Sequence, residues 1–321
     1  MNKCRLIADQ AIPLLVDYFA DYAYIYAMPG EQIDASALQQ ADILLVRSKT
    51  QVNEALLAKA KLKFIGSCAA GVDHLDLAYL QQQQIPFLVS RGCNASAVCN
   101  YVQQTIAIAQ AKQRLVAKGR AAVIGCGHVG SRVATWLTEH GWEVLCYDLP
   151  RAQRDADFQS VAWQDVASVD LICVHSEWIQ RGDRCNTRMI DDAFLARQKD
   201  GCVLINAARG GLIDEVALCK HSQRLTVCVD VWQDERYLPN DLAHQAFLLT
   251  PHIAGNTVLG RANGTAQVYA AMAAQFGWPD KAVPPQYHND THPDLWQLSQ
   301  QTKKAHDIVD FRLKYLAQLP I

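Results

Sequence analysis

Three side chains with complementary chemistry follow apolar, strand-like segments in the second half of the chain: Arg209, Glu235 and His252. The carboxyl ends of parallel strands meet at one edge of a sheet, where doubly wound folds bind their ligands, so we expect the three to lie close together. A guanidinium suits a carboxylate, an imidazole titrates near neutral pH, and a glutamate can fix the orientation of that imidazole. Together they predict proton transfer next to a site that binds an anionic group.

Each residue alone has an ordinary explanation. An arginine after a strand is most often a surface residue, Glu235 stands in a charged QDER stretch, and a histidine after proline can simply end a turn. The prediction therefore depends on all three residues and on the loop upstream of them.

That loop is a glycine pattern at residues 125–130, GCGHVG, which follows the apolar segment AAVIG and precedes a helical pattern. In this context it predicts a dinucleotide site. Gly125 permits the tight turn, Gly127 lets the backbone approach a diphosphate, and Gly130 lets helix pack on strand. His128 and Val129 complete the loop, whose amides would face the diphosphate at the helix N-terminus. The alternative is a tight turn in an unrelated α/β protein.

Asp148 ends the next strand-like segment, where an acid would accept hydrogen bonds from the adenosine ribose. Its charge would repel a 2′-phosphate, which favours NAD over NADP. Arg151 and Arg154 lie close by in the sequence and weigh against that preference.

Short apolar segments alternate with amphipathic ones along most of the chain, which predicts βαβ units and parallel sheets. Predicted strands cover 4–9, 23–27, 42–48, 63–67, 85–90, 120–125, 143–148, 169–176, 201–208, 225–232 and 246–250. Predicted helices include 53–60, 95–115 with Asn94 as N-cap, 260–276 and 295–319, with a proline-rich linker at 281–294.

The pattern predicts an α/β protein with two doubly wound parallel-sheet domains. A Rossmann cofactor domain over 95–252 would be inserted in a flavodoxin-like substrate domain made of 1–94 and 253–285. Residues 286–321 would form a linker and a C-terminal helix.

Composition excludes several classes of protein. The 321 residues carry a formal net charge of −2, which offers no basic surface for nucleic acid. No apolar run approaches the roughly 20 residues that span a bilayer, and no signal peptide is evident. The 11 cysteines contain no CxxC pair, which indicates reduced thiols in a cytoplasmic protein without a metal site.

The segments NAARGGLID, DVWQDE and TPHIAGNT, together with GCGHVG, resemble the D-isomer-specific 2-hydroxyacid dehydrogenases over roughly residues 1–280. The resemblance implies an NAD-dependent homodimeric enzyme in which Arg209 binds the substrate carboxylate and His252, paired with Glu235, transfers the proton. It also implies a set of cofactor contacts beyond the glycine loop and Asp148: Ser176, Ala207, Ala208, Asp230 and Gly255.

LVRSKTQVNEALL, KFIGSCAAGVDHLD and RGCNASAV extend the resemblance to a branch of the family that oxidises 4-phospho-D-erythronate in pyridoxal-phosphate biosynthesis. Backbone amides of Ala69, Ala70 and Gly71 would then contact the substrate carboxylate, and Ser48 would contact the substrate. Arg47 and Lys49, on either side of Ser48, are candidates for its phosphate or else a charge pair at a strand end.

The chain departs from this branch where substrate is contacted. Ala69 stands where the branch has threonine, Asn256 stands at the position of a substrate-binding tyrosine, and Arg236 replaces a proline. The branch continues through a C-terminal dimerisation domain, of which residues 286–321 would be the remnant. Two alternatives remain open: a glycerate or 3-phosphoglycerate type of D-2-hydroxyacid dehydrogenase, and a non-enzymatic NAD-sensing module.

Overall fold

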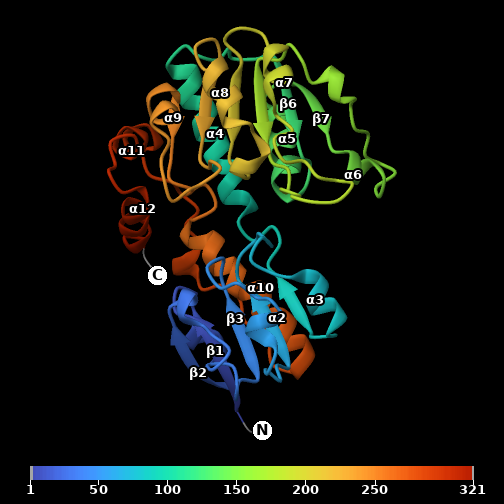
Figure 1. Ribbon diagram of the computed structural model, residues 1–321, viewed down its shortest axis with the longest axis vertical. Helices are drawn as coiled ribbons and strands as arrows, with labels where there is room; N and C mark the ends of the chain where they lie inside the picture. Colours follow the sequence, from blue (N-terminus) through green and yellow to red (C-terminus); the bar gives the residue numbers. More distant parts are fainter. Residues whose placement is uncertain (1–2, 320–321) are drawn as a thin grey trace. The chain divides into compact units, whose positions relative to one another are not determined.

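The computed structural model describes residues 3–319, which divide into two compact units (Figure 1). Unit 1 contains residues up to 94 together with 257–290, and unit 2 contains 95–256 together with 291–319. Each unit has its own parallel sheet with helices packed on it, so the predicted α/β class is confirmed.

Unit 1 contains a five-stranded parallel sheet in the order β2-β1-β3-β4-β5, the flavodoxin-like arrangement. Its strands are β1 Cys4–Asp9, β2 Ala23–Met28, β3 Ile43–Val46, β4 Phe64–Ser67 and β5 Phe87–Val89. Its helices are α1 Leu15–Phe19, α2 Glu54–Leu57, α3 Leu77–Gln82 and α10 Val258–Phe276, with 3-10 turns η1 Gly30–Gln32 and η4 Pro285–Tyr287.

Successive side chains along these strands point to opposite faces of the sheet and pack into two separate cores. Leu6 and Leu45 lie in the cluster with α1 and α10, whereas Ile7 and Leu44 lie in the cluster with α2 and α3. Both faces are covered, as a parallel sheet requires.

Unit 2 contains a six-stranded parallel sheet in the order β11-β10-β9-β8-β6-β7. Its strands are β6 Arg120–Ile124, β7 Glu143–Tyr147, β8 Leu171–Val174, β9 Val203–Asn206, β10 Thr226–Val229 and β11 Leu248–Leu249. Its helices are α4 Ala95–Ala111, α5 His128–Glu139, α6 Leu149–Ala152, α7 Asp192–Ala196, α8 Glu215–His221, α9 Asn240–Gln245, α11 Leu295–Thr302 and α12 Ile308–Ala317, with 3-10 turns η2 Trp163–Asp165 and η3 Gly210–Leu212.

The chain order reverses at β6, because β7 lies on one side of it and β8 on the other. Beyond β7, the Val161 amide donates to the Cys146 carbonyl at 2.9 Å, so an extended segment continues that edge without forming a strand. Ligands of doubly wound sheets bind outside the carboxyl ends at such a reversal, here between β6 and β8.

The C-terminal region differs from the single helix predicted over 295–319. It forms two helices, α11 and α12, drawn in red in Figure 1, and both belong to unit 2. Asp307 caps α12 by accepting from the Asp310 amide at 2.9 Å, so the second helix begins with its own start signal. Residues 320 and 321 lie outside the described residues.

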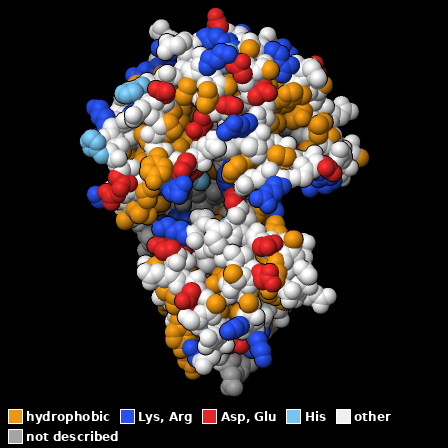
Figure 2. Space-filling view, in the orientation of Figure 1, with side chains coloured by type: hydrophobic (Ala, Val, Ile, Leu, Met, Phe, Trp, Pro, Cys, Tyr) orange, Lys and Arg blue, Asp and Glu red, His pale blue; other side chains and the backbone are white. Residues whose placement is uncertain are grey.

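Side chains of both charges are interspersed on the face shown in Figure 2, without a large area of one sign. No helix within residues 3–319 is long and apolar enough to cross a membrane.

Candidate active site

The glycine loop links β6 to α5 at the reversal point of the unit 2 sheet. Gly125 has a φ of +88°, and a Cβ there would lie 2.4 Å from the Ser176 amide nitrogen. A Cβ on Gly130 would lie 1.9 Å from the Gly125 carbonyl oxygen, so helix and strand pack directly on one another. A Cβ on Gly127 would meet no atom within 4 Å, which leaves open the side from which a diphosphate would approach. The loop therefore has the shape that a dinucleotide site needs.

Asp148, at the end of β7, bonds to this loop. Its carboxylate accepts from the Cys126 amide at 2.8 Å and from the Arg151 amide at 2.9 Å. The Arg151 guanidinium donates to the Cys126 carbonyl and to the Ser131 hydroxyl, each at 2.8 Å, and pairs with Asp155. Arg151 is thus engaged by the loop and by an acid. A carboxylate has about four acceptor sites, so Asp148 can still accept from a ribose.

Arg209 stands at the end of β9, on a turn shaped by Asn206. The Asn206 side chain accepts from the Ala208 amide at 3.1 Å and donates to the Arg209 carbonyl at 3.0 Å. The next residue, Gly210, has no room for a side chain, because a Cβ there would lie 2.0 Å from the backbone of Trp232. The NAARGG sequence therefore brings the arginine loop against the loop that follows β10.

Asp230, at the end of β10, holds the backbone of the histidine turn. This carboxylate is 1% exposed and accepts from the amides of Ile253 at 2.8 Å and Ala254 at 2.9 Å, and from the Thr250 hydroxyl at 2.6 Å. Its carbonyl also accepts from the His252 amide at 2.8 Å. Burial raises the pKa of Asp230, against the lowering effect of His252 and of these donors.

These bonds hold His252 at a φ of +55°, in the left-handed region that non-glycine residues rarely adopt. The conformation costs free energy that the surrounding bonds must offset. The Asn256 side chain adds a further contact by donating to the His252 carbonyl at 2.9 Å.

His252 and Glu235 form the pair expected from the sequence, with His252 Nδ1 2.7 Å from Glu235 Oε2. Burial acts to raise the pKa of Glu235, but the hydrogen bond from His252 and the charges of His252, Arg312 and Arg209 hold it below its ordinary value. The carboxylate is therefore ionised at neutral pH. Since Nδ1 faces Glu235, Nε2 is the imidazole atom suited to exchange a proton with a ligand.

The remaining predicted cofactor positions also lie at the carboxyl ends of unit 2 strands. Ser176 follows β8 beside the glycine loop, and Ala207 and Ala208 follow β9. Gly255 is half-buried in the turn that Asp230 holds, whereas His128 is exposed at the start of α5.

In unit 1, the predicted substrate positions lie at the carboxyl ends of β3 and β4. Ser48 is exposed, and Ala69, Ala70 and Gly71 are half-buried in the loop after β4. That loop is fixed by a buried contact of 3.0 Å between the Ser67 hydroxyl and His74 Nε2.

Two arginines converge at the same edge of unit 1. Arg47 Nη1 and Arg261 Nη2 both donate to the Ala11 carbonyl, at 3.1 Å and 2.8 Å. Burial lowers the pKa of Arg261 to about 10, with a further lowering from Arg47 and an opposing effect of Asp9. Lys49 instead is exposed and lies 3.8 Å from Glu31.

Sequence reasoning missed Arg261 and Arg312. Arg261 lies within a helical pattern, 250 residues from its carbonyl partner. Arg312 is 77 residues from Glu235. No local spacing links either residue to its partner. The one signal in the sequence for Arg261 is that it is the single charged residue of the segment that forms α10, where it is buried.

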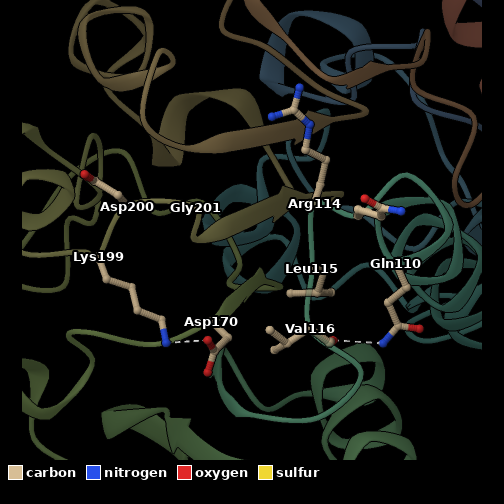
Figure 3. Close-up of a pocket in the computed structure, with 9 residues that line it drawn as sticks. Gln110, Arg114, Leu115, Val116, Asp170, Lys199, Asp200 and Gly201 are labelled. Atoms are coloured by element: carbon tan, nitrogen blue, oxygen red, sulfur yellow. Dashed lines mark hydrogen bonds and ion pairs between the residues drawn. The ribbon is translucent and has the colours of Figure 1, made fainter.

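A pocket of about 410 Å³ lies elsewhere in unit 2, lined by residues that include Arg114, Asp170 and Lys199 (Figure 3). Asp170 and Gly201 precede β8 and β9, so the pocket lies at the amino edge of the sheet, opposite to the residues described above. Among the described residues, no group of histidine, cysteine or acidic side chains could hold a metal ion.

Solved structures share this architecture. D-lactate dehydrogenase from Aquifex aeolicus, complexed with NAD and lactic acid, superposes with a TM-score of 0.66 at 21% identity, over 85% of this chain and 96% of that one. NAD-bound 3-phosphoglycerate dehydrogenase from Entamoeba histolytica superposes with a TM-score of 0.72 at 18% identity, over 86% and 96%. At such identities the likeness establishes the fold.

Sequence comparison establishes the family. The model described as D-isomer specific 2-hydroxyacid dehydrogenase, NAD binding domain, matches residues 95–254. The chain belongs to this family, and it is an NAD-dependent oxidoreductase that acts on hydroxy acids.

Within the family, it is similar to erythronate-4-phosphate dehydrogenases. It is 36% identical to that of Pseudomonas paraeruginosa over 94% of this chain and 80% of the relative. It is 37% identical to that of Coxiella burnetii over 86% and 75%.

Proposed function

We propose that this protein oxidises 4-phospho-D-erythronate at C2 to the corresponding 2-oxo acid, with NAD as the hydride acceptor. The observation that carries the chemistry is the 2.7 Å pair between His252 and Glu235, with Arg209 close enough to lower the pKa of the same carboxylate. The substrate is inferred from the relatives, which share 35–39% identity with the chain.

In the proposed reaction, His252 Nε2 would take the proton of the substrate hydroxyl. Bound NAD would supply the redox chemistry by accepting the hydride from C2. Glu235 stabilises the imidazolium that forms. Arg209 holds the substrate carboxylate through its guanidinium fork. In the reverse direction, His252 returns the proton to the carbonyl oxygen.

The cofactor would lie along the carboxyl edge of unit 2. We assign the diphosphate to the amides of the glycine loop and the ribose to Asp148. We assign the nicotinamide end to Ser176, Asp230 and Gly255, with Ala207 and Ala208 beside it.

Unit 1 would serve as the substrate domain, with Ser48 and the amides of residues 69–71 as contacts. The resemblance assigns Asn256 to the position of a substrate-binding tyrosine. Arg47 and Arg261 support a phosphorylated substrate, because two cations held on one carbonyl repel each other and a phosphate would offset that repulsion. Lys49 is the weaker candidate, since it is exposed beside Glu31.

From the same resemblance we propose the biological setting: a cytoplasmic homodimer in pyridoxal-phosphate biosynthesis. Light scattering of the purified chain would test the dimer, and a monomeric mass would overturn it.

A substrate panel tests the function. The purified chain is assayed for NADH formation with 4-phospho-D-erythronate, unphosphorylated D-erythronate, D-glycerate and 3-phospho-D-glycerate. We expect the highest kcat/KM for 4-phospho-D-erythronate. A preference for glycerate or 3-phosphoglycerate moves the assignment to the alternative enzyme type, and NAD binding without turnover supports the sensing module.

Arginine variants test the phosphate contact. Arg261→Met should lower kcat/KM for 4-phospho-D-erythronate at least tenfold more than for D-erythronate, because a charge-assisted hydrogen bond contributes about 1.5–3 kcal/mol. Lys49→Met is the matched control and should leave the ratio between the two substrates unchanged. Equal losses on both substrates would contradict a phosphate role.

A further inference from the structure

Helix α12 brings a second cation to the carboxylate that orients His252. Arg312 Nη1 lies 3.0 Å from Glu235 Oε2, and His252 Nδ1 lies 2.7 Å from the same oxygen. One carboxylate oxygen therefore serves two donors. Arg312 lies beyond residues 95–254, the segment that the family model matches.

The position of Arg312 is fixed by the packing of its helix. Ile308, at the start of α12, is 4% exposed in one core of unit 2, and Phe311 packs on the same core. The side chain of Arg312 is 30% exposed and that of Glu235 is 26% exposed, so solvent screens their interaction only in part.

We propose that Arg312 is a positioning residue that divides the charge of Glu235 between two cations and thereby sets the pH range in which His252 is the neutral base. With His252 as its only partner, Glu235 would stabilise the imidazolium more strongly. The guanidinium offsets part of that stabilisation, so the imidazole loses its proton at a lower pH and can accept one from substrate there. This inference rests on the acid–base role proposed above for His252.

The charged and titratable groups around His252, Glu235 and Asp230 come from several elements of unit 2. Glu235 and Asp230 follow β10, and Arg209 follows β9. Arg312 comes from α12, as does Tyr315, whose pKa is raised to about 12 by burial and by the charge of Asp230. Arg209 also lowers the pKa of Glu235 through its charge, but it is the arginine assigned to the substrate carboxylate, so Arg312 is the cation near Glu235 that has no proposed contact with substrate.

The alternative is a purely structural role, in which the pair only docks α12 on the unit. A docking contact would affect stability and would leave the pH dependence of the reaction unchanged. The pH profile separates the two roles.

The first experiment measures kcat/KM for hydroxy-acid oxidation against pH in the full chain and in Arg312→Gln. Glutamine removes the charge and keeps a hydrogen-bond donor on a shorter side chain, and the melting temperature of the variant reports any loss of the docking contact. We expect the acid limb of the profile to move to higher pH by about half a unit to one unit, the effect of one charge a few ångströms from another at partial screening. On that limb kcat/KM falls about threefold to tenfold, and near the plateau the variant approaches the parent.

Arg312→Lys, which keeps the positive charge, should restore most of the parental profile. Lys314→Gln is the matched control on the same helix, because Lys314 pairs only locally with Asp310 and is 72% exposed. Profiles of Arg312→Gln and the parent that superpose after scaling, with or without a lower melting temperature, would overturn the proposal.

A second readout does not need the correct substrate. The NMR signal of the His252 imidazole, identified by its absence in His252→Ala, is titrated in the parent and in Arg312→Gln. We expect the titration midpoint of Arg312→Gln to lie at higher pH, and an unchanged midpoint would overturn the inference. If His252→Ala retains full turnover, the proposed function fails instead, whatever this titration gives.

Discussion

The carboxyl edges of the two sheets are built differently. In unit 2, Asp230 is 1% exposed and bonds two amides and a hydroxyl to fix the turn that carries His252. In unit 1, the predicted substrate residues are exposed or half-buried, and Ala69 and Gly71 can offer only backbone groups. The turn that carries His252 is thus held by a buried carboxylate, although the side chains of His252 and Glu235 are themselves 30% and 26% exposed. Residues for substrate selection, by contrast, can change without disturbing a core. This explains how a chain can keep Arg209, Glu235 and His252 while Ala69 differs from the threonine that the resemblance implies there.

The largest effect should come from His252. Replacing it in His252→Ala removes the proposed acid–base group, and we expect kcat to fall by about 10²–10⁴-fold because general acid–base catalysis contributes that much. NAD affinity, measured by fluorescence titration, should change little. The matched control is His244→Ala, an exposed position on α9. A His252→Ala enzyme within tenfold of the parent would show that unit 2 does not carry the proton transfer.

Alanine substitutions at two glycines of the same loop should affect different properties, stability in one case and NAD binding in the other. In Gly130→Ala the Cβ would lie 1.9 Å from a carbonyl oxygen, so we expect the free energy of unfolding to fall by about 1–3 kcal/mol. In Gly127→Ala the Cβ meets no protein atom within 4 Å, so stability should stay within about 0.5 kcal/mol while NAD affinity falls more than tenfold. Denaturant titration and NAD binding of both variants measure this. Equal stability losses in the two would contradict the assignment of Gly127 to the diphosphate.

Two carboxylates near His252 should give opposite pH dependence of stability. The pKa of Glu235 is held below its ordinary value of 4.5, so its contribution is present above that pH and is lost as pH falls through the folded-state pKa. The parent should therefore lose unfolding free energy relative to Glu235→Gln on acidification.

Burial raises the pKa of Asp230 above 3.8, so the native state binds this proton more readily than the unfolded chain does. Its contribution falls as pH rises between 3.8 and the raised pKa, and the parent should gain stability relative to Asp230→Asn on acidification. Urea unfolding of the three proteins across the acidic range measures both differences. If the stability difference between the parent and each variant changed with pH in the same direction, the opposite pH dependence predicted for the two carboxylates would be wrong.

The smallest effect should come from unit 1. Ala69→Thr introduces the hydroxyl that the resemblance implies at this position, and one hydrogen bond contributes about 0.5–1.5 kcal/mol. We expect kcat/KM for 4-phospho-D-erythronate to rise about twofold to tenfold, with an unchanged melting temperature. A lower kcat/KM in Ala69→Thr would indicate that the site has adapted to a different hydroxy acid.

Much of the fold could be predicted because its signals are local. Alternating apolar segments gave the strands, and the glycine spacing between β6 and α5 predicted the dinucleotide loop whose close packing the structure contains. Helix lengths were less predictable. The predicted helix at 95–115 ends at Ala111, where Gln113 turns into the left-handed region with a φ of 56°.

The sequence by itself determined the types and order of the reactive residues, because Arg209, Glu235 and His252 each follow a recognisable strand. Only the tertiary structure decided which side chains share a partner. Glu235 receives Arg312 from a helix 77 residues away, and Ala11 receives Arg261 from 250 residues away. Such contacts arise when whole helices pack on a sheet. The buried apolar residues of a helix set its position, and its polar side chains then contact the neighbouring segments of the fold. Short-range spacing in the sequence predicts strands and loops, but it does not predict which distant segment a polar side chain will contact.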